Sequence, residues 1–202
     1  MKILLNPLPV RIFHWTMALS IIVLVITGLL INDPPMAPIM TVNFVRKLHA
    51  IFGIILILNT LAQFYYYTVK GHWQEVVFLP RDIPNLYSFL RYMFFVTEGM
   101  PYYGRYNPGQ KLVFTTWWLA IIIASVVSMA SLFPNDTTGL QRLIGGLGNV
   151  RAIKYLITMF FVATVPWHIY LSLTEDLARL QAMVTGYIYE EPKGSTKQPP
   201  QF

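Results

Sequence analysis

The sequence contains no cysteine and few charged residues. The absence of cysteine excludes disulfide bonds, thiolate metal sites, iron–sulfur clusters and covalently attached c-type haem within this chain. Any metal or cofactor that the chain holds therefore needs nitrogen, oxygen or thioether ligands. Charged residues make up 12% of the 202 residues and hydrophobic residues 55%. Because an average soluble domain has about 25% charged residues, this composition indicates burial in a membrane.

Four apolar runs are each close to the roughly 20 residues that cross the hydrocarbon core of a bilayer as a helix. A backbone in lipid must satisfy its hydrogen bonds internally, so we expect the runs to be helices packed as a bundle. The predicted fold class is all-α, with a four-helix transmembrane domain over residues 1–176 and a cytoplasmic tail over 177–202. The first run is too long for a signal peptide and no small-residue cleavage site follows it, so it should stay in the mature protein. The predicted helices span residues 10–31, 45–68, 110–132 and 152–173.

Lysine and arginine are divided unequally between the two sides of this bundle. Of the 15 such residues, ten lie on the side that holds both termini and the 69–109 loop, and five lie on the other side. The positive-inside rule therefore places both termini and this loop in the cytoplasm. We attribute the net charge of +6 to contacts with lipid headgroups, because no basic run of the nucleic-acid-binding kind is present. The five residues on the periplasmic side are Arg46, Lys47, Arg142, Arg151 and Lys154.

Three histidines lie inside the predicted helices, where an unpaired imidazole is costly. Lys154 lies 14 residues before His168, on nearly the same helix face and about 21 Å away along the axis. Because the first and fourth helices run in opposite directions, His14 and His168 fall near the cytoplasmic side, and His49 and Lys154 near the periplasmic side. A haem iron bound by imidazole nitrogens from two facing helices would offset the cost of burial. The alternative is that these histidines are interhelical hydrogen-bond groups.

The segment before the third helix has two interpretations. Asn107 and Pro108 have the pattern of a helix N-cap followed by a first-turn proline. The exposed amides of a helix start also suit a carbonyl or quinol ligand. In the loop that precedes them, residues 85–95 are predicted to be an amphipathic segment along the cytoplasmic interface, and His72 is expected to be a solvated loop residue.

Over its whole length the sequence resembles the cytochrome b subunits of membrane-bound formate dehydrogenases, NiFe-hydrogenases and thiosulfate reductases, which are four-helix, quinone-reactive anchors. The resemblance implies that His14 and His168 bind a haem b on the cytoplasmic side. It implies that His49 binds a second haem b, on the periplasmic side, with a histidine that opens the fourth helix. It further implies that Asn107 and Gly109 lie in a menaquinone or ubiquinone site. The matching segments are RIFHW, RKLHAIFGI, GRYNPGQKL and HIYLSLTEDLARLQAMVTGYI.

The chain departs from the family pattern at Lys154, which stands where the second histidine of the periplasmic-side haem is expected. The alternatives are ligation by a neutral lysine amine, a five-coordinate haem on His49, a thioether ligand from Met40 or Met159, and no haem on this side. A single haem near the cytoplasmic side would leave roughly 20 Å to the opposite face. We therefore favour a retained haem with altered ligation.

The function implied by the resemblance is electron transfer in a bacterial or archaeal cytoplasmic membrane. The partners would be a periplasmic iron–sulfur subunit with its catalytic subunit, the quinone pool and lipid. Two alternatives are a stand-alone carrier of the cytochrome b561 type and a haem-free membrane anchor or transporter.

Overall fold

The computed structural model describes residues 2–33, 40–99, 103, 106–174 and 177–189. The predicted cytoplasmic charges of Arg105, Lys193 and Lys197, and the low-complexity end of the predicted tail, lie outside these residues. The described elements in chain order are β1 (Lys2–Leu4), α1 (Leu8–Asn32), α2 (Val42–Lys70), α3 (Trp73–Val76), η2 (Pro80–Asp82), α4 (Ile83–Met93), α5 (Pro108–Leu132), α6 (Thr138–Ile144), α7 (Leu147–Thr174), α8 (Leu177–Thr185) and β2 (Tyr187–Tyr189).

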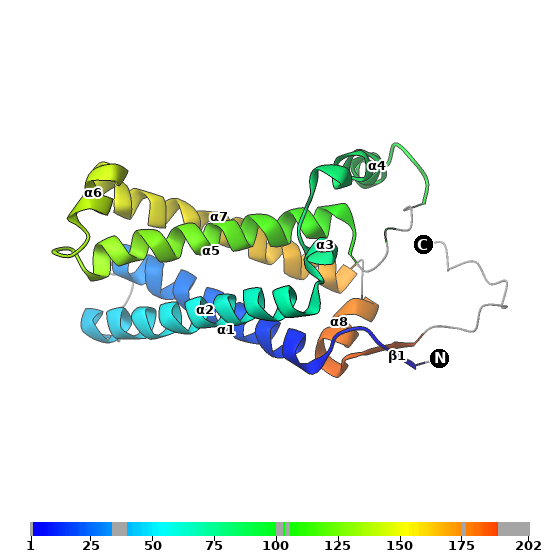
Figure 1. The fold of residues 1–202 in the computed structure, drawn as a ribbon, viewed down its shortest axis with the longest axis horizontal. Helices are drawn as coiled ribbons and strands as arrows, with labels where there is room; N and C mark the ends of the chain where they lie inside the picture. The colour runs from blue at the N-terminus through cyan, green and yellow to red at the C-terminus, as the bar shows by residue number, and fades with distance from the viewer. Residues whose placement is uncertain (1, 34–39, 100–102, 104–105, 175–176, 190–202) are drawn as a thin grey trace.

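The helices α1, α2, α5 and α7 are long and apolar enough to cross a membrane. They run along the long axis of the molecule (Figure 1), which confirms the predicted all-α class with a four-helix bundle. Each helix covers its predicted range and begins before it, and residues ahead of the apolar runs cap two of the four helices, α2 and α5. Thr41 accepts a hydrogen bond from the backbone N–H of Phe44 at 3.3 Å and so starts α2. The start of α5 is capped in the same way by Asn107.

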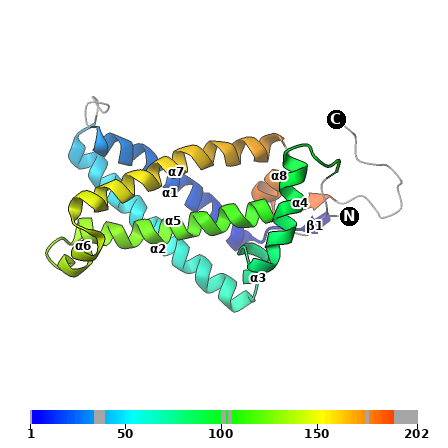
Figure 2. The same ribbon diagram turned by 90° about the horizontal axis from the view of Figure 1, so that it is seen from above.

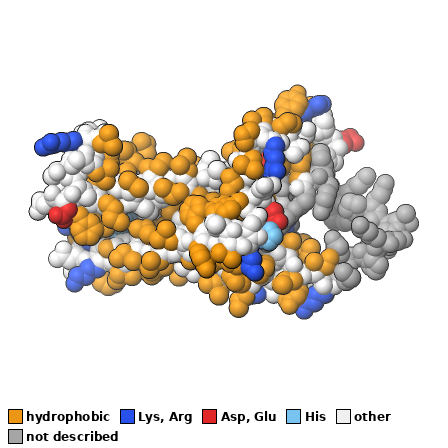
Figure 3. Space-filling model, in the orientation of Figure 1, with side chains coloured by type: hydrophobic (Ala, Val, Ile, Leu, Met, Phe, Trp, Pro, Cys, Tyr) orange, Lys and Arg blue, Asp and Glu red, His pale blue; other side chains and the backbone are white. Residues whose placement is uncertain are grey.

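The four long helices share a small core and turn most of their apolar surface outward. Packing is most extensive between α1 and α2 and then between α5 and α7, and the two pairs meet through α1–α7 and α2–α5 contacts. Apolar side chains cover much of the bundle surface in Figure 3, as expected where lipid replaces water. The core consists of Ile21, Leu56, Trp117, Ile121 and Phe161.

The bundle has two ends that differ in structure (Figure 2). The helix α6 lies at one end, which we call the α6 end. The strand β1 and the helices α3, α4 and α8 lie at the opposite end, which we call the terminal end. The charge distribution in the sequence predicts that the terminal end faces the cytoplasm.

The first part of the predicted tail folds back onto the bundle, which the sequence did not indicate. The helix α8 contacts α7, and β2 pairs with β1 as an antiparallel two-stranded sheet. Two side chains of α1 hold this segment: Arg11 donates to the carbonyl of Val184, and Trp15 Nε1 donates to the carbonyl of Met183 at 3.0 Å. The turn between α8 and β2 uses Gly186 at a φ of 93°, in the left-handed region that glycine tolerates. These long-range hydrogen bonds join α1 to α8.

At the terminal end, an ion pair fastens the segment before α4 to the start of α5. Lys111 Nζ lies 3.0 Å from Asp82 Oδ1, and Asp82 Oδ2 accepts from the backbone N–H of Leu79 at 2.9 Å. Burial raises the pKa of the Asp82 carboxyl, but the Leu79 hydrogen bond and the charges of Lys111 and Arg81 outweigh it, so the pKa lies below its ordinary value. The carboxyl is therefore ionised at neutral pH.

We expect Asp82→Asn to lower the free energy of unfolding by about 2 kcal/mol at neutral pH, because a charge-assisted hydrogen bond is lost. The pKa of Asp82 is lower in the folded than in the unfolded chain. The stabilisation by ionised Asp82 is therefore complete above the ordinary pKa of 3.8 and disappears as the pH falls through the folded-state pKa. The Tm difference between wild type and Asp82→Asn in detergent should therefore shrink toward acid pH. Glu75→Gln is the control, because the carboxylate of Glu75 is 40% exposed in its pair with His72. An Asp82→Asn protein with an unchanged Tm would contradict this role.

Candidate functional site

Two histidines from different helices face each other near the terminal end of the bundle. His14 lies on α1 and His168 on α7, and their ring centroids are 6.4 Å apart with an interplanar angle of 52°. Trp117 of α5 contacts His168 edge-on at 5.4 Å. Its indole N–H donates to Thr164 Oγ1 at 3.1 Å, which fixes the tryptophan against α7. The structure thus brings together the histidines that the sequence paired at this depth.

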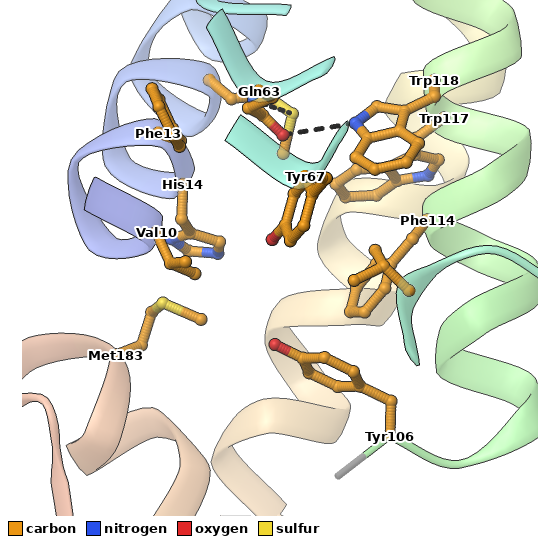
Figure 4. A pocket seen from close by; sticks show the side chains of 12 residues that line it. Val10, Phe13, His14, Gln63, Tyr67, Tyr106, Phe114, Trp117, Trp118 and Met183 are labelled. Atoms are coloured by element: carbon orange, nitrogen blue, oxygen red, sulfur yellow. Dashed lines mark hydrogen bonds between the residues drawn. The ribbon is translucent and has the colours of Figure 1, made fainter. Parts of the chain in front are cut away.

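A cavity adjoins His14 between α1, α2, α5 and α8 (Figure 4). Its volume is about 70 Å³, and it is partly open to the surroundings. Its walls are mainly apolar and aromatic, and the hydroxyls of Tyr67 and Tyr106 point into it. Met183 of α8 closes the side below His14. The returning C-terminal segment therefore forms one wall of the cavity.

The second pair lies toward the α6 end. His49 Nδ1 of α2 lies 2.7 Å from the hydroxyl of Thr27 on α1. A Cβ at Gly28 would lie 3.6 Å from His49 Cε1 and 3.5 Å from Thr158 Oγ1, so α1, α2 and α7 meet at this histidine. Lys154 lies one turn before Thr158 on α7, and its carbonyl accepts a hydrogen bond from the Thr158 hydroxyl at 3.0 Å. His49 and Lys154 therefore share one depth of the bundle, as the sequence predicts.

The two methionines considered as thioether ligands differ in burial. Met40 precedes α2 and is 49% exposed. Met159 lies within α7 and is half-buried. Met159 is therefore in the more protected position of the two.

Asn107 caps α5, and the structure shows which part of its amide the cap uses. Asn107 Oδ1 accepts from the backbone N–H of Gln110 at 2.8 Å, and Gln110 Oε1 accepts from the backbone N–H of Asn107 at 3.1 Å. The Nδ2 group of Asn107 donates to no partner among the described residues. A Cβ at Gly109 would lie 2.5 Å from Cε1 of Phe89 on α4, so glycine is needed for close packing there. Packing explains Gly109 by itself, whereas the amide N–H of Asn107 is available to a ligand.

The fourth histidine lies at the surface of the terminal end. The side chain of His72 is 47% exposed and its Nδ1 lies 2.9 Å from Glu75 Oε1. It is separate from both pairs, as expected for a solvated residue.

Comparison with known proteins identifies the family. Residues 6–186, which make up most of the chain, match the family model of prokaryotic cytochrome b561. The chain belongs to the prokaryotic cytochrome b561 family. The matched region includes the four long helices and α8. A cytochrome b561 is a b-type cytochrome of membranes, so this family member is a multi-pass membrane protein with haem b as its cofactor.

Curated relatives of this cytochrome b561 family member carry one name, "probable Ni/Fe-hydrogenase B-type cytochrome subunit". The relative from Cupriavidus necator is 25% identical, over 89% of this chain and 84% of its own length. The relative from Azotobacter vinelandii is 26% identical, over 88% of this chain and 82% of its own length. The relative from Rhodobacter capsulatus is 28% identical, over 89% of this chain and 77% of its own length. The sequence resembled the cytochrome b subunits of three kinds of enzyme, and the names of these relatives refer to one of them, the Ni/Fe-hydrogenase.

The donor atoms at the terminal end fit a haem. Within the described ranges, no group of three or more His, Asp or Glu side chains is placed to hold a metal ion, so two imidazoles alone would leave an ion under-coordinated. Haem b would bring four nitrogens of its own, and His14 and His168 would supply the remaining two. The imidazoles of His14 and His168 come from two different helices, and their ring centroids are 6.4 Å apart. In addition, His14 Nδ1 is buried without a hydrogen-bond partner among the described residues.

Sequence reasoning missed three residues of these sites. Thr27 and Trp117 contact the histidines directly, and Met183 closes the cavity. Threonine and tryptophan are common in apolar helices, so nothing in the sequence singled them out. The one usable signal was the opposite direction of the first two helices, which places Thr27 and His49 at similar depths.

Proposed function

We propose that this protein is the electron-carrying membrane subunit of a Ni/Fe-hydrogenase-type complex and connects an iron–sulfur subunit to the quinone pool. The observation that carries the proposal is the presence of two nitrogen-donor pairs at opposite depths of one bundle. His14 with His168 lies near the terminal end, and His49 with Lys154 lies toward the α6 end. The hydrogenase partner is inferred from the names of the relatives.

The side chains at the two depths have separate tasks. His14 and His168 would hold one haem b, and His49 with the amine of Lys154 would hold a second. Haem b supplies one-electron oxidation and reduction when bound. Trp117 and the aromatic walls of the cavity exclude water from the first pair, and Thr27 contacts the second.

The orientation of the subunit follows from charge. We place residues 1–176 in the bacterial or archaeal cytoplasmic membrane, with the terminal end and the 177–202 segment on the cytoplasmic side. The α6 end then faces the periplasm and the iron–sulfur and catalytic subunits. Exposed cations at this end suit an acidic partner surface or lipid headgroups. They are Arg46, Lys47, Arg142 and Arg151.

The proposed quinone site is the start of α5, where the Nδ2 group of Asn107 donates to a quinone carbonyl while its Oδ1 caps the helix. We expect Asn107→Asp to keep the cap and remove the donor. Loss of one hydrogen bond of about 1 kcal/mol should raise the apparent KM for quinone about five-fold. Haem spectra and the Tm should stay at wild-type values, because aspartate is an equally good N-cap.

Asn107→Ala is the companion variant, since it removes both the cap and the donor. It should show the same rise in KM together with a lower Tm. If Asn107 is only a helix cap, Asn107→Asp will have wild-type quinone kinetics and Asn107→Ala will change stability alone. Gly109→Ala cannot make this distinction, because its Cβ displaces Phe89.

Purification in mild detergent tests the function as a whole. We expect the protein to carry haem b and to co-purify with larger subunits that oxidise hydrogen. A stand-alone carrier of the cytochrome b561 type would purify alone with its haem. Protein without a Soret absorption band would instead be an anchor or transporter, and the electron-transfer proposal would be wrong.

A further inference from the structure

The hydroxyl of Thr27 forms two short contacts that together determine which nitrogen of His49 carries its proton. Thr27 Oγ1 lies 2.6 Å from the carbonyl oxygen of Val23 and 2.7 Å from His49 Nδ1. The threonine is 3% exposed, so water does not compete for its hydroxyl. Both contacts are within hydrogen-bond distance.

A hydroxyl has one proton to donate, whereas a carbonyl oxygen can only accept. If Thr27 donated to His49 Nδ1, its oxygen would face the carbonyl oxygen of Val23 at 2.6 Å with no proton between them. If Thr27 donates to Val23 instead, its lone pairs accept an N–H from His49 and both contacts become hydrogen bonds. Threonines in helices commonly donate to the carbonyl four residues earlier. The second arrangement is therefore the one that the distances support.

This arrangement leaves His49 protonated at Nδ1 and unprotonated at Nε2. Nε2 has no hydrogen-bond partner in the part of the chain that the structure describes. Cε1, the ring atom between the two nitrogens, lies at the junction with α7 that Gly28 leaves open. A neutral imidazole with a free Nε2 lone pair is the form that binds a metal.

The geometry points to Thr27 as a positioning residue, which holds His49 in the Nδ1–H tautomer with Nε2 free to bind haem iron. Rotation of the imidazole is restrained because the hydrogen bond joins α1 to α2. When the Nδ1–H of a histidine donates a hydrogen bond, its Nε2 becomes a stronger electron donor to iron, which favours ferric over ferrous iron. This inference rests on the proposed haem at His49, and the tautomer itself can be tested without haem.

The test compares Thr27→Val, which has the same shape without the hydroxyl, with Thr27→Ser, which keeps the hydroxyl. Thr60→Val is the matched control, because Thr60 is 5% exposed and, among the described residues, its hydroxyl bonds only the carbonyl of Leu56 in its own helix. Nitrogen-15 NMR of the histidine-labelled full chain, before addition of haem, reports the tautomer. We expect the Nδ1–H form of His49 in wild type, Thr27→Ser and Thr60→Val, and its loss in Thr27→Val.

After loading with haem, the same variants are compared by haem content, electron paramagnetic resonance and redox titration. Thr27→Val should bind the His49-side haem about 10–100-fold more weakly. The His49-side haem that is still bound should have a more positive potential than in wild type. The His14–His168 haem should be unchanged in all variants. An unchanged tautomer in Thr27→Val, or an Nε2–H form in wild type, would overturn the inference. Wild-type protein with the expected tautomer and no haem at His49 would overturn the two-haem proposal and uphold the assignment of the proton.

Discussion

Replacing His168 with alanine is expected to remove the terminal-end haem and to abolish electron transfer to quinone. The substitution deletes one of two facing imidazoles, 6.4 Å apart between ring centroids, and leaves a cavity next to Trp117. Loss of a residue that only orients a ligand costs 10–100-fold in metal affinity, so loss of the ligand itself should cost more than about 100-fold. Haem content by absorbance and quinone-linked turnover with hydrogen measure the two effects. Activity of the partner subunits toward artificial dyes should persist, because they do not need this centre.

His72→Ala is the matched control for this variant. It removes a histidine from the same end of the protein, but the side chain is 47% exposed and paired with Glu75. Haem content and turnover should both remain at wild-type values. If His168→Ala retains a full complement of haem with unaltered spectra, His168 is not an axial ligand and the assignment of the site is wrong.

Replacing Lys154 with histidine is expected to change the ligand field of the haem on the α6 side. If the lysine amine is the second ligand, Lys154→His gives a bis-histidine centre with His49, and Lys154→Met gives a histidine–methionine centre of higher potential. Lys154→Ala should lose the ligand altogether. Low-temperature electron paramagnetic resonance of the oxidised protein distinguishes these states by their different signals.

Arg151→Ala controls for the removal of a positive charge, because Arg151 is an exposed residue earlier on the same helix. In Arg151→Ala, loss of the charge is expected to shift the potential of the His49-side haem. The electron paramagnetic resonance signal of this haem should remain that of wild type. A His49-side signal that is identical in wild type and Lys154→Ala would show that lysine is not a ligand. Lys154 would then be a cation near the haem or the headgroups.

The long helices and the depth of each histidine were predictable because they depend on local properties of the sequence. Apolar length determines which runs cross a bilayer, and the alternation of direction then sets which residues share a depth. His14 and His168 could be paired in this way before the structure placed them together. The departure at Lys154 was visible by a different route, from the resemblance to the family pattern.

The missed features depend on contacts between residues far apart in the chain. The polar composition of the C-terminal segment indicated a tail, but Arg11 and Trp15 donate to its carbonyls and hold α8 against the bundle. The resemblance implies a quinone site at Gly109, and the sequence did not indicate that this glycine also packs closely against Phe89. Such contacts leave no periodic pattern in the sequence, so only the folded structure reveals them.

The number of haems per chain tests the central claim most directly. A pyridine haemochrome determination on the purified full-length protein, with protein measured by amino-acid analysis, gives this number. Two donor pairs at opposite depths predict two haem b groups per chain, and a redox titration should resolve them as two components. A single haem per chain would contradict the two-haem relay, and a protein without haem would contradict the electron-transfer function itself.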